Sequence, residues 1–562
     1  MEEVETGLRP MEGVSTSTAG FIGMAEKGKV CGTPEFVSSF ADFNRKFGGY
    51  LPESVYGEYR YLAYAVEQFF ANGGSRCYVM RTMPSDAAPA KVTTNGVTIA
   101  AKSPGKWGNE IKVMVYPTSK GKTNVLEAVD ETSGGKVYTV ANGSIFAAGD
   151  IVAIKNNGKV ASYNRIASVQ ENAITLETPV KEDLVDKTPV PKKVITTCEL
   201  NMEVVYKDTL ETYEGVSFNE NEATYITKML NKSAIVDVTV DRLSVTGAPL
   251  AVFSAAPEAE KALVLLAGGT DGGKQGITDD IFIGVDGGPG NRTGLAAFKE
   301  VNNVSIMAIP GVTSPAVQLA LTSHCANTGA SFAVLDVPKD KVKPQDVLAH
   351  REKVESDYAA MYHPWIQVYD ALNKKPAYIP PSGAVCGIFA RSDAERGVHK
   401  APANEVVHNC IGLSSLYNKA EQDILNPSGV NLIRALPGQG IRVWGARTCS
   451  SNSLWKYVNV RRLFIYLEES IKSNTNWAVF EPNDEMLWTR VGRTIRGFLR
   501  DMWRSGALVG ITEEQAFYVN IGRDTMSQSD ILNGRLICEI GVAPSRPAEF
   551  VIFRITQFME EA

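Results

Sequence analysis

The stretch IGVAPSRPAEFVIFRITQFMEEA, from Ile540 to Ala562, is the one around which the rest of the chain is organised. Its centre is an apolar run of β-branched and aromatic residues of strand length, bounded by Pro544, Pro547 and an acidic end. Such a strand aggregates or frays unless it pairs with a sheet edge. That edge belongs to the same chain or to a neighbour, and in the second case strand addition between subunits makes the function one of assembly. The residues expected to pair are Phe550, Val551, Ile552, Phe553 and Ile555.

The opposite end of the chain has the composition of a flexible arm that leads into a strand. Glycine, proline and the run Ser15-Thr16-Ser17-Thr18 precede Gly20-Phe21-Ile22-Gly23. We therefore expect residues 1–29 to form an N-terminal linker and strand, with Phe21 and Ile22 in the strand.

The sequence pattern of the next part of the chain changes once, from α/β to all-β. Residues 30–92 alternate helical and strand-like apolar runs, which predicts an α/β segment. Residues 93–195 show short strand-like runs cut by tight turns such as Asn142-Gly143, which is typical of an all-β module. We interpret residues 93–195 as a β-rich domain inserted into an α/β chain.

The second half returns to the α/β pattern. Residues 196–430 contain fully apolar runs such as Ala262 to Ala267, which are typical of buried parallel strands, and predict a three-layer α/β domain with helices on both sheet faces. Residues 431–547 carry two long helical patterns and predict a separate α+β C-terminal domain, followed by the arm strand at 548–562. The fold class is thus multidomain, α/β plus α+β.

The composition and net charge of the chain argue against several classes of function. The 562 residues are 44% hydrophobic and 21% charged, which indicates a globular chain of several domains. A formal charge of −6 argues against direct nucleic-acid binding, and the absence of a long apolar run argues against membrane insertion. The acidic residues 1–5 do not resemble a secretion signal, so we expect the chain to stay where it is made or to leave by lysis. The eight cysteines are scattered without zinc-site spacing, so no metal site or cofactor is expected.

Two motifs suggest catalysis and then fail. Gly268 to Lys274 fits the phosphate-binding loop G-x-x-x-x-G-K, but Gln275 stands where a Ser or Thr must reach magnesium. Asp336, His363 and Ser382 follow one another along an α/β region and include the three residue types of a Ser-His-Asp hydrolase. However, no serine of the sequence lies in the motif G-x-S-x-G that surrounds the nucleophile of such enzymes. We expect no catalytic residues, although an enzyme that depends on Ser382 or Lys274 remains an open alternative.

A helical pattern that begins at Asp484 carries a basic stripe on an acidic chain. Its apolar side runs from Trp488 to Trp503 at helical spacing, and arginines occupy the other side. These arginines form either an ordinary solvated face or a docking face for an acidic partner, where charge complementarity fixes register. They are Arg490, Arg493, Arg496, Arg500 and Arg504.

Several segments give the sequence a family resemblance that spans nearly the whole chain. It resembles the tail sheath proteins of contractile phage tails and related contractile injection systems. The most specific segments are in the C-terminal part, and the others lie nearer the N-terminus. They are Gly20 to Gly28, Phe69 to Gly74, Leu266 to Gly272, Asn459 to Phe464, Val479 to Asp484, Ile540 to Pro544 and Pro547 to Phe550.

The resemblance implies a subtilisin-like middle domain without working catalytic residues, and a variable module near residues 93–195 that faces outward. It implies that the N-terminal arm, with Phe21 and Ile22, and the C-terminal strand pair with sheets of neighbouring subunits. The basic helix would face an inner tail tube. The partners implied are further copies in stacked hexameric rings, the tube protein, baseplate and tail terminator proteins; the location is the virion tail, after assembly in the host cytoplasm.

Function follows as an expectation. The chain is expected to polymerise as a helical array around the tube and to contract, which drives the tube through the host envelope. Without a nucleotide or metal site, the work must come from free energy stored in a kinetically trapped assembly. The alternative is a surface or adhesion module that resembles an inactive hydrolase and uses the β-rich insertion.

Overall fold

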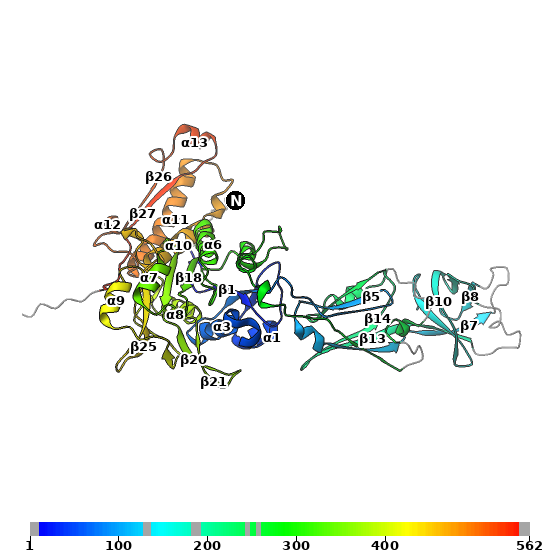
Figure 1. Cartoon of the computed structure of the whole chain (residues 1–562). Helices are drawn as coiled ribbons and strands as arrows, with labels where there is room; N and C mark the ends of the chain where they lie inside the picture. Colours follow the sequence, from blue (N-terminus) through cyan, green and yellow to red (C-terminus); the bar gives the residue numbers. More distant parts are fainter. Residues whose placement is uncertain (1–10, 128–135, 181–192, 242–247, 255–259, 550–562) are drawn as a thin grey trace, which may run out of the picture. The chain divides into compact units, whose positions relative to one another are not determined.

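The computed structural model describes residues 11–127, 136–180, 193–241, 248–254 and 260–549 (Figure 1). The chain divides into two compact units, each with its own apolar cores. Within the described ranges, no helix is both long enough and apolar enough to cross a membrane. The first unit comprises Met1–Ala25, Lys29–Met83 and Ile277–Ala562, and the second Glu26–Gly28 and Pro84–Gly276.

A nine-stranded sheet forms the centre of the first unit, in the order β2-β3-β1-β17-β18-β19-β24-β25-β22. The strands from β3 to β24 run parallel, and antiparallel strands complete both edges. The four central strands are buried along their whole length, because both sheet faces are covered. The strands are β1 (Ala19–Met24), β2 (Glu35–Val37), β3 (Cys77–Thr82), β17 (Ile306–Ala308), β18 (Phe332–Asp336), β19 (Ala359–His363), β22 (Glu405–Val406), β24 (Val430–Leu436) and β25 (Gly440–Val443).

Helices cover both faces of this sheet, and each face has its own apolar core. Successive strand residues point to opposite cores: Phe21 packs in one and Ile22 in the other. The prediction of a three-layer α/β domain is therefore confirmed. The first face is covered by α1 (Phe40–Phe47), α3 (Leu62–Ala71), α8 (Ser382–Arg396) and the start of α10 (Val458–Asn474); the second by α5 (Asp279–Ile283), α6 (Pro315–Thr328), α7 (Pro344–Arg351) and α9 (Lys419–Leu425). The short helix α2 spans Glu53–Tyr56, and a small sheet joins β20 (Ile366–Asp370), β21 (Lys375–Ile379) and β23 (Gly412–Leu413).

The C-terminal part of the first unit packs two long helices around a small ribbon (Figure 1). The second helix, α11, begins where the side chain of Asp484 accepts a hydrogen bond from the Leu487 amide at 2.8 Å, the contact that the N-terminus of a helix favours. Both long helices that the sequence predicted are present. The elements besides α10 are α11 (Glu485–Arg504), α12 (Glu513–Ala516), β26 (Phe517–Ile521), α13 (Gln528–Leu532) and β27 (Cys538–Val542).

The second unit is almost entirely β. A closed barrel has the strand order β10-β11-β8-β7-β12-β9, and two further sheets have the orders β14-β13-β6-β16 and β15-β5-β4. The barrel and the sheets have separate apolar cores. The elements are β4 (Lys91–Thr94), β5 (Val97–Ala101), β6 (Lys112–Thr118), β7 (Lys122–Glu127), β8 (Val137–Val140), β9 (Ile151–Asn156), β10 (Lys159–Gln170), β11 (Ala173–Leu176), β12 (Lys193–Thr197), β13 (Glu199–Tyr206), β14 (Thr209–Val216), α4 (Ile226–Leu230), β15 (Val236–Val240) and β16 (Ala262–Leu265).

The division of the chain differs from the predicted boundaries. The β-rich unit runs from 84 to 276, whereas the sequence placed it at 93–195. The apolar run that begins at Ala262 caused the error. It forms β16, an antiparallel edge strand in which Leu263 and Leu265 are 59% and 53% exposed, and not a buried parallel strand. A short apolar run has the same composition in either setting.

The C-terminal boundary also shifts. β24 begins at Val430 and pairs in parallel with β19, so the large sheet continues past the predicted boundary between residues 430 and 431.

Candidate functional site

The first turns of α10 hold a buried ion pair. Arg462 donates two hydrogen bonds to Asp393 of α8, at 2.9 and 2.6 Å, and both side chains are almost fully buried. The Arg462 guanidinium also lies 4.7 Å from the ring centre of Phe389. Removing one partner of such a pair leaves an uncompensated buried charge, at a cost of about 3–5 kcal/mol. The start of α10 is therefore fixed firmly to the sheet domain.

The same arginine holds the N-terminal segment, residues 11–18. Arg462 donates a hydrogen bond to the carbonyl of Thr16 at 2.9 Å. Further along α10, the amide of Val14 donates to Ser470 Oγ at 3.1 Å. The side chain of Asn474 exchanges two hydrogen bonds with the backbone of Glu12, at 3.2 and 2.8 Å. The segment thus runs antiparallel to α10 and is held through its backbone.

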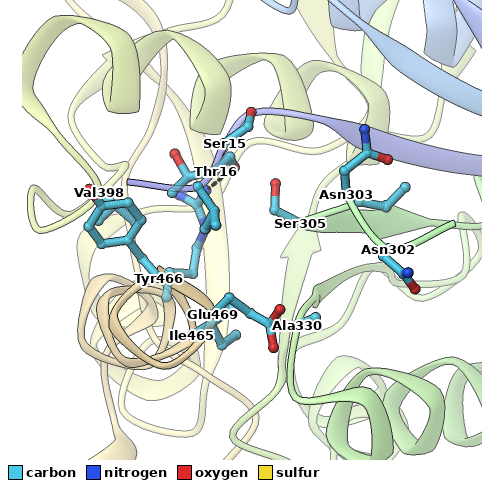
Figure 2. Close-up of a pocket in the computed structure, with 13 residues that line it drawn as sticks. Ser15, Thr16, Asn302, Asn303, Ser305, Ala330, Val398, Ile465, Tyr466 and Glu469 are labelled. Atoms are coloured by element: carbon cyan, nitrogen blue, oxygen red, sulfur yellow. Dashed lines mark hydrogen bonds between the residues drawn. The ribbon is translucent and has the colours of Figure 1, made fainter. Parts of the chain in front are cut away.

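At the contact between the N-terminal segment and α10, Gly13 lies close to Tyr466 and a small cavity lies beside it. A Cβ atom on Gly13 would lie 1.9 Å from the Tyr466 hydroxyl oxygen, so any larger residue at this position requires the Tyr466 ring or the segment to move. Beside it, residues 14–16 of the segment, residues 302–305 and side chains of α10 line a cavity of about 100 Å³ (Figure 2). The N-terminal segment is therefore bound at a few points and is not packed along its whole length.

The C-terminal segment is anchored at Glu549, the last described residue. Its carboxylate accepts hydrogen bonds from Arg447 at 2.6 and 2.6 Å, from Asn426 at 2.8 Å and from Tyr457 at 3.2 Å. Burial alone would raise the pKa of Glu549, but the hydrogen bonds from Arg447 and Asn426 outweigh it and hold the pKa below its ordinary value. Asn459 of α10 also donates to the carbonyl of Ser545, at 3.3 Å. The described residues nearest to both chain ends are thus held beside α10.

The ribbon of β26 and β27 has two outer strand edges that no described strand pairs. Two strands are marginal as a sheet, and unpaired edges accept further strands. This ribbon packs against α11, and a groove lies on each side of that helix. The ribbon therefore offers two places for an added strand.

The groove beside β27 is apolar. It has a volume of about 740 Å³. Phe480 on its rim is fully exposed and has a φ of +68°, a conformation that costs free energy in a residue other than glycine. Side chains of α10, α11, β27 and the loop before β27 form the walls: Ile471, Leu487, Val491, Ile495, Leu536 and Ile540.

The five predicted arginines lie on α11 but differ in their contacts. Arg490 pairs with Glu481 at 3.3 Å, and Arg500 pairs with Glu513 at 2.8 Å. Arg496 donates to the carbonyl of Val519 at 2.9 Å. Arg493 makes no ion pair with the described residues, and Arg504 makes no hydrogen bond with them. Arg493, Arg496 and Arg500 line the groove beside β26, together with Arg523.

The structure corrects the prediction for Phe21 and Ile22. Both residues are buried in β1, which pairs with β3 on one side and β17 on the other, within the same chain. In this arrangement they have no free edge to share with a neighbour. The residues Phe550, Val551, Ile552, Phe553 and Ile555 lie outside the described residues.

The triad residues do not assemble as a catalytic set. Ser382 donates its Oγ–H to Asp336 at 2.7 Å and its amide to the same carboxylate at 2.9 Å, which fixes the start of α8. His363 bonds Tyr417 at 2.8 Å through Nε2. Burial raises the pKa of Asp336 to about 6 and lowers the pKa of His363 to about 3. These contacts are structural.

The glycine-rich loop has its amides already occupied. The Gly273 amide donates to Asp86 at 3.1 and 3.0 Å, and the Gly269 amide donates to Asn109 at 2.8 Å. A carboxylate thus lies where a phosphate would bind, and a short 3-10 turn, Lys274–Gly276, follows in place of a long helix. The loop has the geometry of a turn within the β-rich unit.

The sequence reading missed the residues that anchor the ends. One signal was present: Arg461 and Arg462 interrupt the apolar pattern Val458, Val460, Leu463, and charged residues on a buried helix face are almost always paired. For Glu549 and Arg447, 102 residues apart, no local pattern connects the two.

Comparison with known proteins decides the family. Residues 284–449 match the family model described as the phage tail sheath protein central domain, and residues 450–558 match the phage tail sheath C-terminal domain. This chain belongs to the contractile tail sheath family. The first match spans the later strands of the large sheet, and the second spans α10, α11 and the ribbon. Curated relatives of the sheath family agree with these matches.

A prophage major tail sheath protein of Pseudomonas aeruginosa is 26% identical over 277 residues, which is 47% of this chain and 69% of the relative. The tail sheath protein of Escherichia phage P2 is 27% identical over 243 residues, 41% of this chain and 60% of the relative. That of Burkholderia phage BcepMu is 27% identical over 256 residues, 42% and 53%. The matched part therefore covers between 53% and 69% of these three sheath proteins.

Solved structures share the fold over nearly the whole sheath chain. The sheath of an extracellular contractile injection system, PVC, in its contracted state has a TM-score of 0.53 and 20% identity, and covers 100% of this chain and 97% of its own. A sheath tail protein from Listeria innocua has a TM-score of 0.54 and 11% identity, and covers 95% and 96%.

Proposed function

We propose that this chain is the sheath subunit of a contractile tail, which polymerises as a helical array of stacked hexameric rings around an inner tube. Shortening of the array drives the tube through the host envelope. Support comes from the two sheath domains in the sequence and from relatives that are named as tail sheath proteins. The location is the virion tail, after assembly in the host cytoplasm.

One observation carries the proposal: the described residues nearest to both chain ends are held beside one helix, next to a ribbon whose outer edges no described strand pairs. Arg462 holds the N-terminal segment and Arg447 holds Glu549. A subunit whose terminal segments are held at Thr16 and Glu549 can transmit force to the neighbouring subunits that its two ends bind. A ribbon whose outer edges pair with no described strand would supply the acceptor.

We assign the C-terminal strand of one subunit to the β27 edge of a second. The apolar residues Phe550, Val551, Ile552, Phe553 and Ile555 match the apolar groove of about 740 Å³ in character. Backbone hydrogen bonds to the edge would supply affinity, and the groove would select apolar side chains. Phe480 on the rim would close over the added strand.

The tube contact is proposed for the basic face of α11. Arg490 and Arg504 lie toward its two ends, outside the groove beside β26, and are exposed. An acidic surface on the tube would complement them, and mutual steering would speed assembly and fix the register. The predicted role of Arg493, Arg496 and Arg500 in the same contact is part of this proposal.

The work of contraction would come from the assembly itself. We propose no enzymatic step and a subtilisin-like ancestry for the middle domain, in which Asp336 and Ser382 have a structural role. The extended array would be a kinetic trap that a baseplate releases, and a terminator protein would limit its length. A surface or adhesion role for the β-rich unit is the second candidate, which the exposed Leu263 and Leu265 on β16 favour.

Electron microscopy of the purified chain tests the function. The chain is examined over a range of concentrations, alone and with the cognate tube protein. Hollow helical tubes, or a helical coat on the tube, are expected. Particles that stay monomeric in both conditions would overturn the sheath role for this chain.

A further inference from the structure

The four-stranded sheet of the β-rich unit has two outer edges, and no described strand pairs along either of them. The strand order is β14-β13-β6-β16, in which β14 pairs with β13 and β16 pairs with β6. Just beyond β16, the carbonyl of Ala267 accepts a hydrogen bond from the amide of Lys91 at 2.9 Å. The edge of β16 from Lys261 to Leu265 pairs with no further described strand.

The backbone groups of β16 point alternately toward β6 and toward this edge. The Leu266 amide donates to the carbonyl of Ile111, on the side of β6, whereas the next residue bonds Lys91 on the opposite side. The N–H and C=O of one residue in an antiparallel ladder point the same way, and the direction alternates along the strand. The groups of Leu263 and Leu265 therefore face the outer edge, where an added strand would bond to them.

Both edges of the sheet carry exposed leucines. Leu263 and Leu265 of β16 are 59% and 53% exposed, and Leu210 of β14 is 59% exposed. The pairing registers place Leu265 and Leu210 at the two ends of one row across the sheet, through Lys112 and Val205. Exposed apolar residues at a sheet edge favour association with another strand.

The strand directions allow the sheet of one copy to continue into the sheet of the next. Every neighbouring pair is antiparallel, so β14 and β16, at the ends of a row of four strands, run in opposite directions. The β14 edge of a second copy in the same orientation therefore meets the β16 edge of the first as an antiparallel neighbour. Such a contact repeats from copy to copy, as in rings and helical arrays.

One register matches the two edges in both polarity and charge. All six side chains that it brings together are exposed, and neither Lys261 nor Glu214 forms an ion pair with a described residue. A shift of one residue would turn the side chains of the added strand to the other face, and a shift of two would separate Lys261 from Glu214. The pairs are Leu265 with Leu210, Leu263 with Thr212 and Lys261 with Glu214.

We infer that the β16 edge of one copy binds the β14 edge of a second copy, so that the β-rich units of neighbouring subunits share one continuous sheet. The inference goes beyond the proposed function, in which the chain ends join subunits, and rests on it only for the array that brings the copies together. It assigns Leu263 and Leu265 to a contact between copies, in place of the surface or adhesion role.

Cysteine cross-linking of the full-length chain tests this contact. Leu210→Cys and Leu265→Cys are combined in a chain that also carries Cys31→Ser, because Cys31 is exposed, and the assembled sample is oxidised with copper phenanthroline. Opposed residues of neighbouring strands lie close enough for a disulfide. We expect a ladder of covalent oligomers in denaturing electrophoresis, since each copy joins two others. Each single variant should give monomers alone and dimers when mixed with the other, and the Cys31→Ser parent should give monomers.

Three changes to the double-cysteine chain test the edge and its register. Leu263→Pro removes an N–H that faces the outer edge and no bond to β6, so the chain should fold, as judged by circular dichroism, and give no ladder. Lys261→Glu should slow cross-linking about threefold, and Glu214→Lys added to it should restore the rate, because the exposed ion pair forms again in the opposite sense. Leu126→Cys in place of Leu210→Cys puts a similarly exposed cysteine in the barrel and should give no ladder.

Electron microscopy of the same samples separates this contact from the proposed function. Tubes without a ladder, or a ladder that survives Leu263→Pro, would overturn the inference and leave the sheath role intact. Dimers from the Leu265→Cys chain alone would mean that two β16 edges pair with each other, which also contradicts it. A ladder without tubes would contradict the proposed function alone, and monomers without tubes would contradict both.

Discussion

Arg447 holds Glu549 through two hydrogen bonds of 2.6 Å, from Nε to one carboxylate oxygen and from Nη2 to the other. This paired geometry is the strongest that an arginine forms with a carboxylate. It fixes the position of Glu549, the last described residue. The proposed strand exchange depends on this fixed point, because a strand must reach the neighbour's edge in one register.

Replacement of Glu549 with Gln should weaken the attachment of the C-terminal segment to Arg447 without unfolding the domain. The loss of a charged hydrogen-bond partner costs about 1–3 kcal/mol locally. We expect a similar melting temperature, faster proteolytic trimming after residue 549, and at least a tenfold rise in the concentration needed for tubes. Arg535→Ala is the matched control, because that arginine pairs with Asp530 on the surface. Unchanged assembly by the Gln variant would show that the contact between Glu549 and Arg447 is not needed for tube formation.

Gly13 should tolerate no side chain while Tyr466 is present. A Val at position 13 would meet the Tyr466 hydroxyl and lift the N-terminal segment from α10. Hydrogen exchange should accelerate at the amides of Glu12 and Val14, which bond to Asn474 and Ser470. The double variant with Tyr466→Ala should restore most of the protection, since the clash is removed. Independent, additive effects of the two changes would contradict this contact.

Much of this fold could be predicted from hydrophobic patterns. The mainly apolar segments Ile306–Ala308 and Phe332–Asp336 form buried parallel strands, which is the arrangement that the apolar runs of residues 196–430 predicted. The run at Ala262 failed because half of its side chains face solvent at a sheet edge. The composition of a segment can indicate a strand, but whether both faces of that strand are buried depends on the elements that pack against it.

The site was harder to predict than the fold. The apolar end and the basic stripe are local features, so the sequence displays them. The anchoring pairs Arg447 with Glu549 and Arg462 with Asp393 join residues 102 and 69 positions apart, which no local pattern connects. Phe21 and Ile22 were misassigned because a strand near the start of a chain has the same composition whether its own sheet or a neighbour's receives it.

Ser382→Ala should reduce stability and leave assembly unchanged. The Ser382 hydroxyl donates to the buried carboxylate of Asp336, and its loss should destabilise the domain by about 1–3 kcal/mol. The measurement is the melting temperature, alongside tube formation by microscopy. His363→Ala should also lower the melting temperature, because its ring bonds Tyr417 in the core. A hydrolytic activity that disappears in the Ser382→Ala chain would support the enzyme alternative.

The buried carboxyl of Asp336 should make stability depend on pH in a defined direction. Burial raises its folded pKa to about 6, above the value in the unfolded chain, so the folded state binds a proton more tightly. As the pH falls from about 7 to about 4, this group should add stability. The melting temperature of wild type relative to Asp336→Asn should therefore rise over this range. A constant difference would mean that the carboxyl does not titrate there.

Loss of residues 549–562 tests the central claim most directly. The full chain and the chain ending at residue 548 are compared by electron microscopy, with and without the inner tube, after circular dichroism has shown equal folding. We predict hollow tubes or coated inner tubes from the full chain, and folded, soluble particles that form neither from the shortened chain. Tubes of normal length and symmetry from the shortened chain would contradict the proposal that the C-terminal strand joins one sheath subunit to the next.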